Sequence, residues 1–162
     1  MKIRKSTAAD LPRMLEIYAY AREFMAATGN PHQWGDGGNP RPEVLEQDIE
    51  DGVGYVMEKE GRIVGAFAFI IGEDETYGVI EDGEWLNDEP YGTIHRIAGD
   101  GSTKGVLKAC VEFGAGIINN IRIDTHHDNK VMQNAIKKCG FEECGTIYVQ
   151  DGTPRIAYQK II

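Results

Sequence analysis

One short stretch of the sequence, HRIAGDGSTKGVLK from His95 to Lys108, combines residue types that could perform chemistry. Histidine titrates close to neutral pH, so His95 is a candidate general base, with a hydrogen-bonded core histidine as the alternative. The glycines, hydroxyls and lysine between Gly99 and Gly105 are typical of a loop that binds phosphate through backbone N–H groups where a helix begins. An ordinary flexible turn is the alternative, because neither G-x-x-x-x-G-K-[ST] nor G-x-G-x-x-G is present.

A second group of chemically active residues is the run His126-His127-Asp128. Adjacent residues at a junction between strand and helix are expected to point apart, and no third ligand converges on them, so we predict no metal site. Asp128 is instead expected to cap the helix that follows. The three cysteines form no C-x-x-C pair, which favours reduced thiols in a cytoplasm, and Cys110 is expected to be a core residue of a helix.

The elements that must position these residues follow from hydrophobic periodicity. The pattern predicts strands over residues 2–5, 53–58, 63–71, 93–98, 121–125, 141–149 and 155–160, and helices over about 8–28, 42–52, 102–114 and 129–139. The order β-α-α-β-β-β-α-β-α-β-β has no linker or repeat, so residues 1–162 are predicted to form a single mixed α/β domain. The helix crossover in the middle of the chain implies at least one parallel strand pair.

The strand over residues 93–98 carries the candidate base and leads into the glycine-rich loop. Strict alternation places Thr93, His95 and Ile97 on one face and Arg96 on the other. Because this strand and the strand over 121–125 should be neighbours, we expect Arg96 to form an ion pair with Asp124.

Composition limits the class of function. The chain has a net charge of −9 and a pI near 4.9, which argues against nucleic acid as a partner, because binding phosphate backbones requires clustered Lys and Arg. The start of the chain lacks the apolar core of a signal peptide, and the longest apolar run, residues 63–71, is too short to cross a bilayer. The sequence therefore predicts a cytoplasmic protein without a membrane partner.

Several strings, taken in order, resemble the GNAT N-acetyltransferase superfamily. They are IRKSTAADLPRMLEIY, GRIVGAFAF, IHRIAGDGSTKGVLKACVEF and RIDTHHDNKVMQNAIKKCGFEECG, and the most specific part is N-x-x-x-x-x-A-x-x-x-x-GF from Asn129 to Phe141. More narrowly, GNPHQW, DGEW, IHRIA and IRIDTH resemble a bacterial subgroup. The resemblance implies a GNAT fold, with a central, mixed, twisted sheet flanked by about four helices, and acetyl-CoA as a co-substrate. It also implies direct acetyl transfer to an amine, with a homodimer as a candidate oligomeric form.

The family's pyrophosphate loop, [QR]-x-x-G-x-[GA], is matched in part. Gly105 falls on its first glycine, whereas Ser102 and Leu107 replace the other two signature residues. Backbone N–H groups can come from any residue, so the resemblance still implies that this loop binds acetyl-CoA. Asn129 is expected to contact the pantetheine arm. The cofactor-binding residues are predicted to be Ile97, Ala98, Gly99, Ser102, Thr103, Lys104, Gly105, Val106 and Asn129.

The family's proton donor is replaced in this sequence. The tyrosine that usually protonates the leaving thiolate lies four residues before the glycine of Gly-Phe, and here that position is Ile136. Tyr148, Tyr91 and His95 are candidate substitutes, and the predicted catalytic residues are His95 and Tyr148. The alternative is a catalytically weak or inactive acyl-CoA-binding or sensing module on the same fold.

Two clues to the acceptor point in different directions. Residues 73–89 hold eight acidic residues and no Lys or Arg. Because aromatic rings beside carboxylates suit an organic cation, we predict that a small primary amine binds between Trp34, Trp85 and Tyr91. The alternative is that this segment is a solvated loop. Arg155 could instead bind a carboxylate, and an amino-acid-like acceptor would satisfy both clues. The predicted substrate-binding residues are Trp34, Trp85, Tyr91, Asp124, His126 and Arg155.

Overall fold

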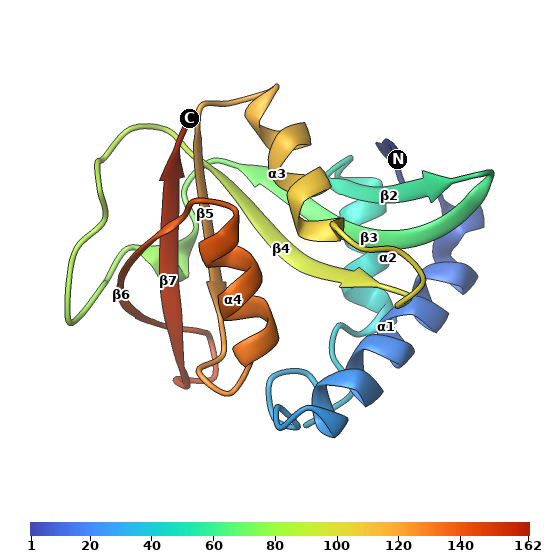
Figure 1. The fold of residues 1–162 in the computed structure, drawn as a ribbon, viewed down its shortest axis with the longest axis horizontal. Helices are drawn as coiled ribbons and strands as arrows, with labels where there is room; N and C mark the ends of the chain where they lie inside the picture. The colour runs from blue at the N-terminus through green and yellow to red at the C-terminus, as the bar shows by residue number, and fades with distance from the viewer.

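Seven strands form one sheet in the computed structural model, which describes residues 1–162 (Figure 1). Their order across the sheet is β1-β2-β3-β4-β5-β7-β6. The strands are β1 (Lys2–Lys5), β2 (Gly54–Lys59), β3 (Arg62–Ile71), β4 (Gly92–Gly99), β5 (Asn120–Thr125), β6 (Glu142–Tyr148) and β7 (Pro154–Ile161). The helices are α1 (Leu11–Ala27), α2 (Pro42–Glu50), α3 (Val106–Ala115) and α4 (Lys130–Lys138), with short 3₁₀ turns at Ala8–Asp10 and Glu75–Tyr77. The predicted element order and mixed α/β class are confirmed.

Two predicted helix starts are wrong in detail. Helix α3 begins at Val106 rather than at residue 102, because Gly105 has a left-handed backbone (φ 77°) that the preceding loop needs and a helix excludes. Helix α4 is capped by Asn129 rather than by Asp128, since the Asn129 side chain accepts a hydrogen bond from the backbone N–H of Met132.

Strands β4 and β5 are the parallel neighbours of the sheet, and they separate soon after they meet. Only two residue pairs join them, Gly92 with Ile121 and Thr93 with Arg122. Figure 1 shows the two strands side by side at one end and diverging toward the other. Beyond Thr93 the edge of β4 that faces β5 therefore has no strand partner, and its backbone polar groups border a gap in the sheet.

A bulge in β4 changes which side chains share a face. His95 pairs with Ala68 of β3, but the next pair on that face is Ala98 with Ala66, so β4 has one extra residue between them. Arg96 lies at the bulge with a left-handed backbone (φ 53°). The predicted alternation is therefore wrong after His95, which shares its face with Ala98.

Two helices hold the bulge in place. The Arg96 guanidinium donates two hydrogen bonds to the Asp48 carboxylate of α2, at 2.9 and 2.8 Å, and the Tyr18 hydroxyl of α1 donates to the Arg96 carbonyl at 2.6 Å. The predicted ion pair between Arg96 and Asp124 is wrong, because the left-handed backbone turns Arg96 toward α2.

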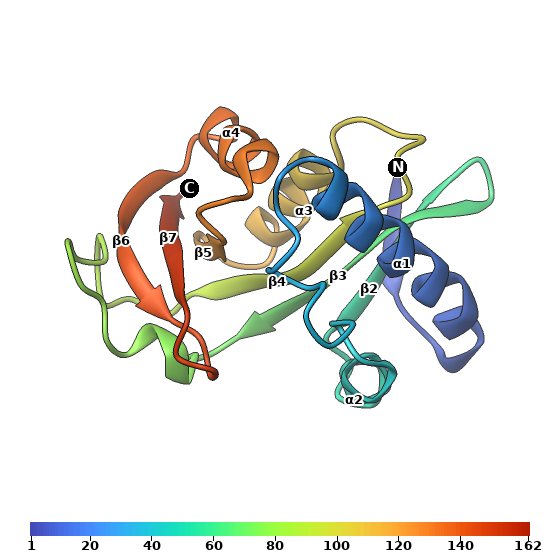
Figure 2. The ribbon, with the colours of Figure 1, turned by 90° about the horizontal axis from the view of Figure 1, so that it is seen from below.

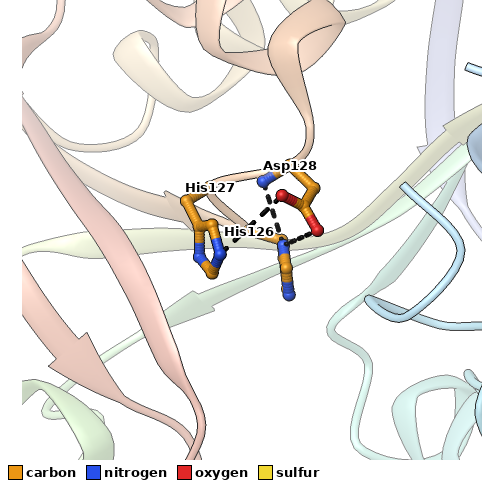
Figure 3. Close-up of side chains that lie close together, drawn as sticks. All are labelled: His126, His127 and Asp128. Atoms are coloured by element: carbon orange, nitrogen blue, oxygen red, sulfur yellow. Dashed lines mark hydrogen bonds and ion pairs between the residues drawn. The ribbon is translucent and has the colours of Figure 1, made fainter. Parts of the chain in front are cut away.

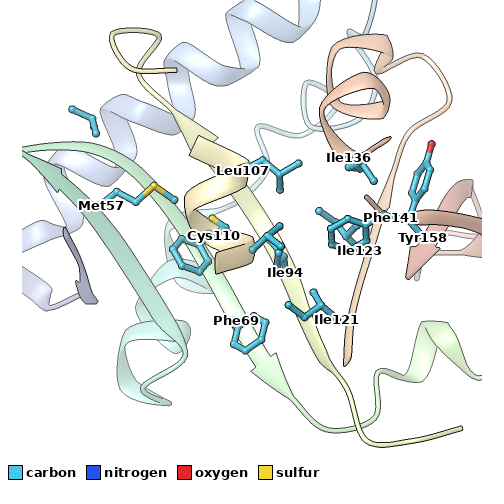
Figure 4. Close-up of a cluster of buried hydrophobic side chains, with 13 residues drawn as sticks. Met57, Phe69, Ile94, Leu107, Cys110, Ile121, Ile123, Ile136, Phe141 and Tyr158 are labelled. Carbon is cyan, nitrogen blue, oxygen red and sulfur yellow. The ribbon is translucent and has the colours of Figure 1, made fainter. Parts of the chain in front are cut away.

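The core is divided by the sheet. Helices α3 and α4 cover one face with a cluster of 13 buried residues, and α1 and α2 cover the other face with a cluster of eight (Figures 2 and 4). Cys110 of α3 and Ile136 of α4 are both completely buried in the larger cluster, as expected for the cysteine. None of the helices combines the length and the apolar character needed to cross a membrane.

Candidate functional site

Two cavities meet at the gap between β4 and β5. The loop cavity, of about 690 Å³, lies between the C-terminal half of α1, the loop 99–105, the start of α3 and the outer side of α4. The histidine cavity, of about 560 Å³, contains His95 and is bounded by the α1–α2 loop and the ends of β5 and β7. Four residues line both cavities, namely Met25, Ile97, Asn129 and Met132. A ligand in one cavity can therefore present an atom to a ligand in the other.

Most of the predicted loop residues line the loop cavity. These are Ile97, Ala98, Gly99, Thr103, Gly105, Val106 and Asn129. Ser102 and Lys104 do not line it, and the Ser102 N–H and hydroxyl both donate to the Asp100 carboxylate, at 2.9 and 2.5 Å. Thus the serine shapes the turn, whereas the cavity receives the backbone around it. No side chain caps α3, so N–H groups of its first turn are available to an anion.

The lysine side chains that line the loop cavity come from α3, α4 and β7 rather than from the predicted loop. Lys108 of α3, Lys138 of α4 and Lys160 of β7 line it, and none of them was among the predicted residues. Lys108 is in the first turn of α3 and Lys138 is in the last turn of α4, so a helical projection could have suggested them. Lys160 is recognisable only once β7 has been placed in the sheet.

Asn129 is more constrained than its predicted role implies. Its side-chain oxygen caps α4, and its amide donates to the Gln33 side chain of the α1–α2 loop at 3.0 Å. Asn129 therefore connects the two cavities structurally, and the contact to a pantetheine arm stays a prediction.

His95 is held by a carboxylate that was not among the predicted site residues. Its Nε2 lies 2.9 Å from Asp74 Oδ2, and the other Asp74 oxygen accepts hydrogen bonds from the Thr76 N–H and hydroxyl. Burial by itself raises the pKa of Asp74, but the hydrogen bonds from His95 and Thr76 outweigh it and lower that pKa to about 2.

The ionised state of Asp74 determines the tautomer of His95. An ionised carboxylate can only accept hydrogen bonds, so the hydrogen on neutral His95 must be on Nε2. The Nδ1 atom then carries the free lone pair, and no protein group donates to it. Because His95 lines the histidine cavity, this arrangement provides a base that is oriented by the Asp74 carboxylate.

The pKa of a second carboxylate in the histidine cavity is shifted in the opposite direction. Asp124 of β5 accepts a hydrogen bond of 2.6 Å from the hydroxyl of the buried Tyr77. Burial raises the pKa of Asp124, although the Tyr77 hydrogen bond acts against this rise. As a result, Asp74 is the more strongly ionised of these two carboxylates, and Asp124 takes up a proton more readily.

Arg155 of β7 also lines the histidine cavity, and its contact with a substrate stays a prediction. It is only 8% exposed, and burial lowers its pKa. Its Nη1 donates to the Thr153 hydroxyl and the Pro154 carbonyl, and no carboxylate lies within 4 Å of its guanidinium.

The predicted aromatic cage is wrong. Trp34 lines the histidine cavity and packs edge-to-face on Tyr18, but Trp85 and Tyr91 line neither cavity. Both of these rings stack against the guanidinium of Arg122, with its central carbon 4.0 Å and 3.9 Å from the two ring centres. The two aromatics therefore already bind a cation of the protein itself.

The predicted proton donor Tyr148 is also not at the site. It is exposed, lines neither cavity, and its hydroxyl donates to Glu81 at 3.0 Å. The acidic segment 73–89 is not a free loop, because Glu81 pairs with Thr146 of β6. From this segment, the histidine cavity receives Asp74 and Thr76.

His126 does not contact either cavity, contrary to its predicted substrate role. Its ring stacks on that of His127 with centres 4.4 Å apart, and its Nδ1 accepts a hydrogen bond from the Asp128 N–H (Figure 3). The expectation that these side chains point apart is wrong, since ligand atoms of His126, His127 and Asp128 all lie within 4.8 Å of one another. However, the backbone hydrogen bond already engages the His126 Nδ1 lone pair.

Comparisons with known proteins agree with this architecture. A family model described as an acetyltransferase (GNAT) domain matches residues 1–142. A solved GNAT-family acetyltransferase from Streptococcus agalactiae 2603 is 30% identical, with a TM-score of 0.91, over 99% of this chain and 95% of that one. A GNAT-family acetyltransferase from Listeria monocytogenes 4b F2365 is 22% identical, with a TM-score of 0.73, over 99% and 94% of the two chains. The ribosomal-protein-alanine N-acetyltransferase of Brucella melitensis is 21% identical, with a TM-score of 0.60, over both full chains. The last two likenesses concern the fold alone, and no curated protein matches the chain.

Proposed function

Because this chain belongs to the GNAT acetyltransferase family, we propose that it transfers an acetyl group from acetyl-CoA directly to the primary amine of a small molecule or amino-acid-like acceptor. One observation carries the proposal. The oriented base His95 opens into a cavity that joins the loop cavity at the gap between β4 and β5. Amine and acetyl donor can therefore meet there from the two cavities.

The loop cavity suits acetyl-CoA by the chemistry of its donors. The uncapped start of α3 and the side chains of Lys108 and Lys138 offer hydrogen bonds and positive charge to phosphates. The unpaired edge of β4 offers backbone N–H and C=O groups to the amides of a pantetheine arm. Acetyl-CoA supplies the activated acetyl group.

His95 acts on the attacking amine. Its Nδ1 accepts the proton that the amine nitrogen loses as the new C–N bond forms, and Asp74 stabilises the resulting imidazolium through Nε2–H. Asp124 accepts from Tyr77 through Oδ2 and keeps its other oxygen for the amine. Departure of the thiolate needs no strong acid, because thiols titrate only slightly above neutral pH. Ile136, which is buried in the core, has no part in these steps.

A catalytically weak or inactive acyl-CoA-binding module is the second candidate. The observation that favours it is the lack of a proton donor at Ile136, together with the position of Tyr148 outside both cavities.

The two functions are separated by measuring thiol release from acetyl-CoA with a panel of amines and amino acids. We expect release above the uncatalysed rate, and a fall in kcat of about 100-fold or more for His95→Ala with CoA binding retained. The matched control is His127→Ala, which removes an exposed imidazole that lines neither cavity and should leave kcat unchanged. CoA binding without any thiol release would support the module and contradict the enzyme.

A further inference from the structure

Arg155 differs from Arg122, the other arginine that is more than nine-tenths buried, and from three partly exposed arginines of the chain. Arg4, Arg13 and Arg96 each pair with a carboxylate at 2.7–2.9 Å, and Arg122 is covered by two aromatic rings. Arg155 has neither kind of partner, although it is more than nine-tenths buried and lines the histidine cavity.

The hydrogen bonds of Arg155 leave one edge of its guanidinium free. Nη1 is engaged by the Thr153 hydroxyl and the Pro154 carbonyl, but Nε and Nη2 have no acceptor in the protein. The Nε–Nη2 edge is a planar pair of donors whose spacing matches the two oxygens of a carboxylate. The charges of Asp124 and Asp151 act on Arg155 from a distance, but neither carboxylate hydrogen-bonds its guanidinium. A ligand carboxylate at this edge would give the buried charge the direct partner that it lacks.

The other charges of the histidine cavity are already partnered. Asp74 binds His95, Asp124 accepts from Tyr77, and Asp151 accepts two hydrogen bonds from Thr153. The aromatic rings expected to hold a cationic acceptor are occupied by Arg122. Hence the cavity has an unfilled place for an anion and a base for an amine, despite the net charge of −9 of the whole chain.

We infer that the acceptor is an amino acid or a similarly small amino-carboxylate, with its carboxylate on Arg155 and its amine toward His95. This inference rests on the proposed acetyl transfer and narrows its substrate class. Arg155 is then the residue that determines specificity, and Trp34 supplies an apolar wall of the same cavity.

The first test uses the wild-type protein and matched acceptors. Each set contains an amino acid, its carboxamide and the amine left after decarboxylation, and thiol release from acetyl-CoA gives kcat/KM. We expect the carboxylate to be preferred by about 100-fold, as for truncation of one partner of a desolvated charge pair. Equal or faster reaction of the decarboxylated amine would overturn the inference while leaving the transferase proposal intact. No thiol release with any acceptor would instead contradict the transferase proposal.

The second test changes the arginine. For Arg155→Met we expect the KM for the amino acid to rise at least about 30-fold, with the KM for acetyl-CoA and the reaction of the decarboxylated amine unchanged. Arg155→Lys should recover part of the loss, because it keeps the charge but not the paired donors. The control Arg22→Gln removes one positive charge from a residue that lines neither cavity, and should change neither KM. An amino-acid KM that is the same in Arg155→Met and wild type would refute the inference.

A binding measurement needs no turnover. In the presence of CoA, the N-acetylated amino acid should raise the melting temperature of the wild-type protein, and should not raise that of Arg155→Met. Circular dichroism of the variant establishes that it is folded. An equal rise in both proteins would contradict the role of Arg155, whether or not acetyl transfer is observed.

Discussion

The bulge in β4 depends on a single strained residue, which makes it the most direct test of how the site is built. Arg96 has a left-handed backbone (φ 53°), and its guanidinium forms two hydrogen bonds with Asp48, which is 7% exposed. A side chain other than glycine in this conformation costs about 1–2 kcal/mol. The ion pair with α2 and the Tyr18 hydrogen bond must offset that cost.

Two substitutions separate the ion pair from the strain. Arg96→Ala removes the partner of a buried carboxylate and keeps the unfavourable backbone, so the free energy of unfolding should fall by about 3 kcal/mol. This value is at the lower end for buried ion pairs, because the Arg96 side chain is 23% exposed. Arg96→Gly removes the same ion pair but relieves the strain, so its loss should be smaller by about 1 kcal/mol.

The assay is urea unfolding at neutral pH, combined with thiol release per folded molecule. Both variants should lose activity, because the bulge orients the end of β4 that borders both cavities. The matched control is Arg4→Ala, which removes a comparable pair with Asp10 at the sheet edge and should reduce stability without reducing the activity of the folded protein. If Arg96→Gly proves no more stable than Arg96→Ala, backbone strain at this position is refuted.

Three shorter predictions concern Asp74 in the site and two residues outside it. Asp74→Asn should lower the free energy of unfolding by about 2 kcal/mol at pH 7. Because the pKa of Asp74 in the folded protein is about 2, below the ordinary 3.8, this difference from wild type should shrink in urea titrations as the pH falls from about 5 to 2. A difference that does not depend on pH would contradict this prediction. Thr93→Val removes a buried hydroxyl that has no hydrogen-bond partner, so thermal or urea unfolding should show a gain of about 1 kcal/mol, and a loss of that size would show that the hydroxyl is satisfied. Tyr148→Phe should leave kcat unchanged in the thiol-release assay, since its hydroxyl lies outside both cavities; a fall of tenfold or more would restore this tyrosine as the proton donor.

Much of the fold was accessible from local patterns. Pro42 does occupy the first position of α2, Gly140 does follow α4 with a left-handed backbone (φ 86°), and Cys110 is buried on the inner face of α3. These features depend on residues within one or two turns of each other, which is the range that capping and periodicity describe. The resemblance to GNAT acetyltransferases rested on the same local strings and is confirmed by the family model.

The errors share a different cause. Arg96 was assigned to Asp124 because their strands were expected to be neighbours, but one extra residue in β4 turned it to a carboxylate 48 residues earlier in the chain. Trp85 and Tyr91 were assigned to a ligand, and instead they enclose Arg122, whose side chain no local pattern had placed beside them. In both cases the choice of partner depended on contacts that sequence spacing does not encode.

The sequence by itself determined the order of elements, the family and the presence of a basic residue before a glycine-rich loop, because these follow from neighbours along the chain. Only the tertiary structure decided that Asp74 orients His95, that β4 and β5 separate to join two cavities, and that no carboxylate hydrogen-bonds Arg155. The physical reason is that a charged or polar group takes the partner that folding brings within hydrogen-bond distance. That partner lies 21 residues away along the chain for His95 and 48 residues away for Arg96.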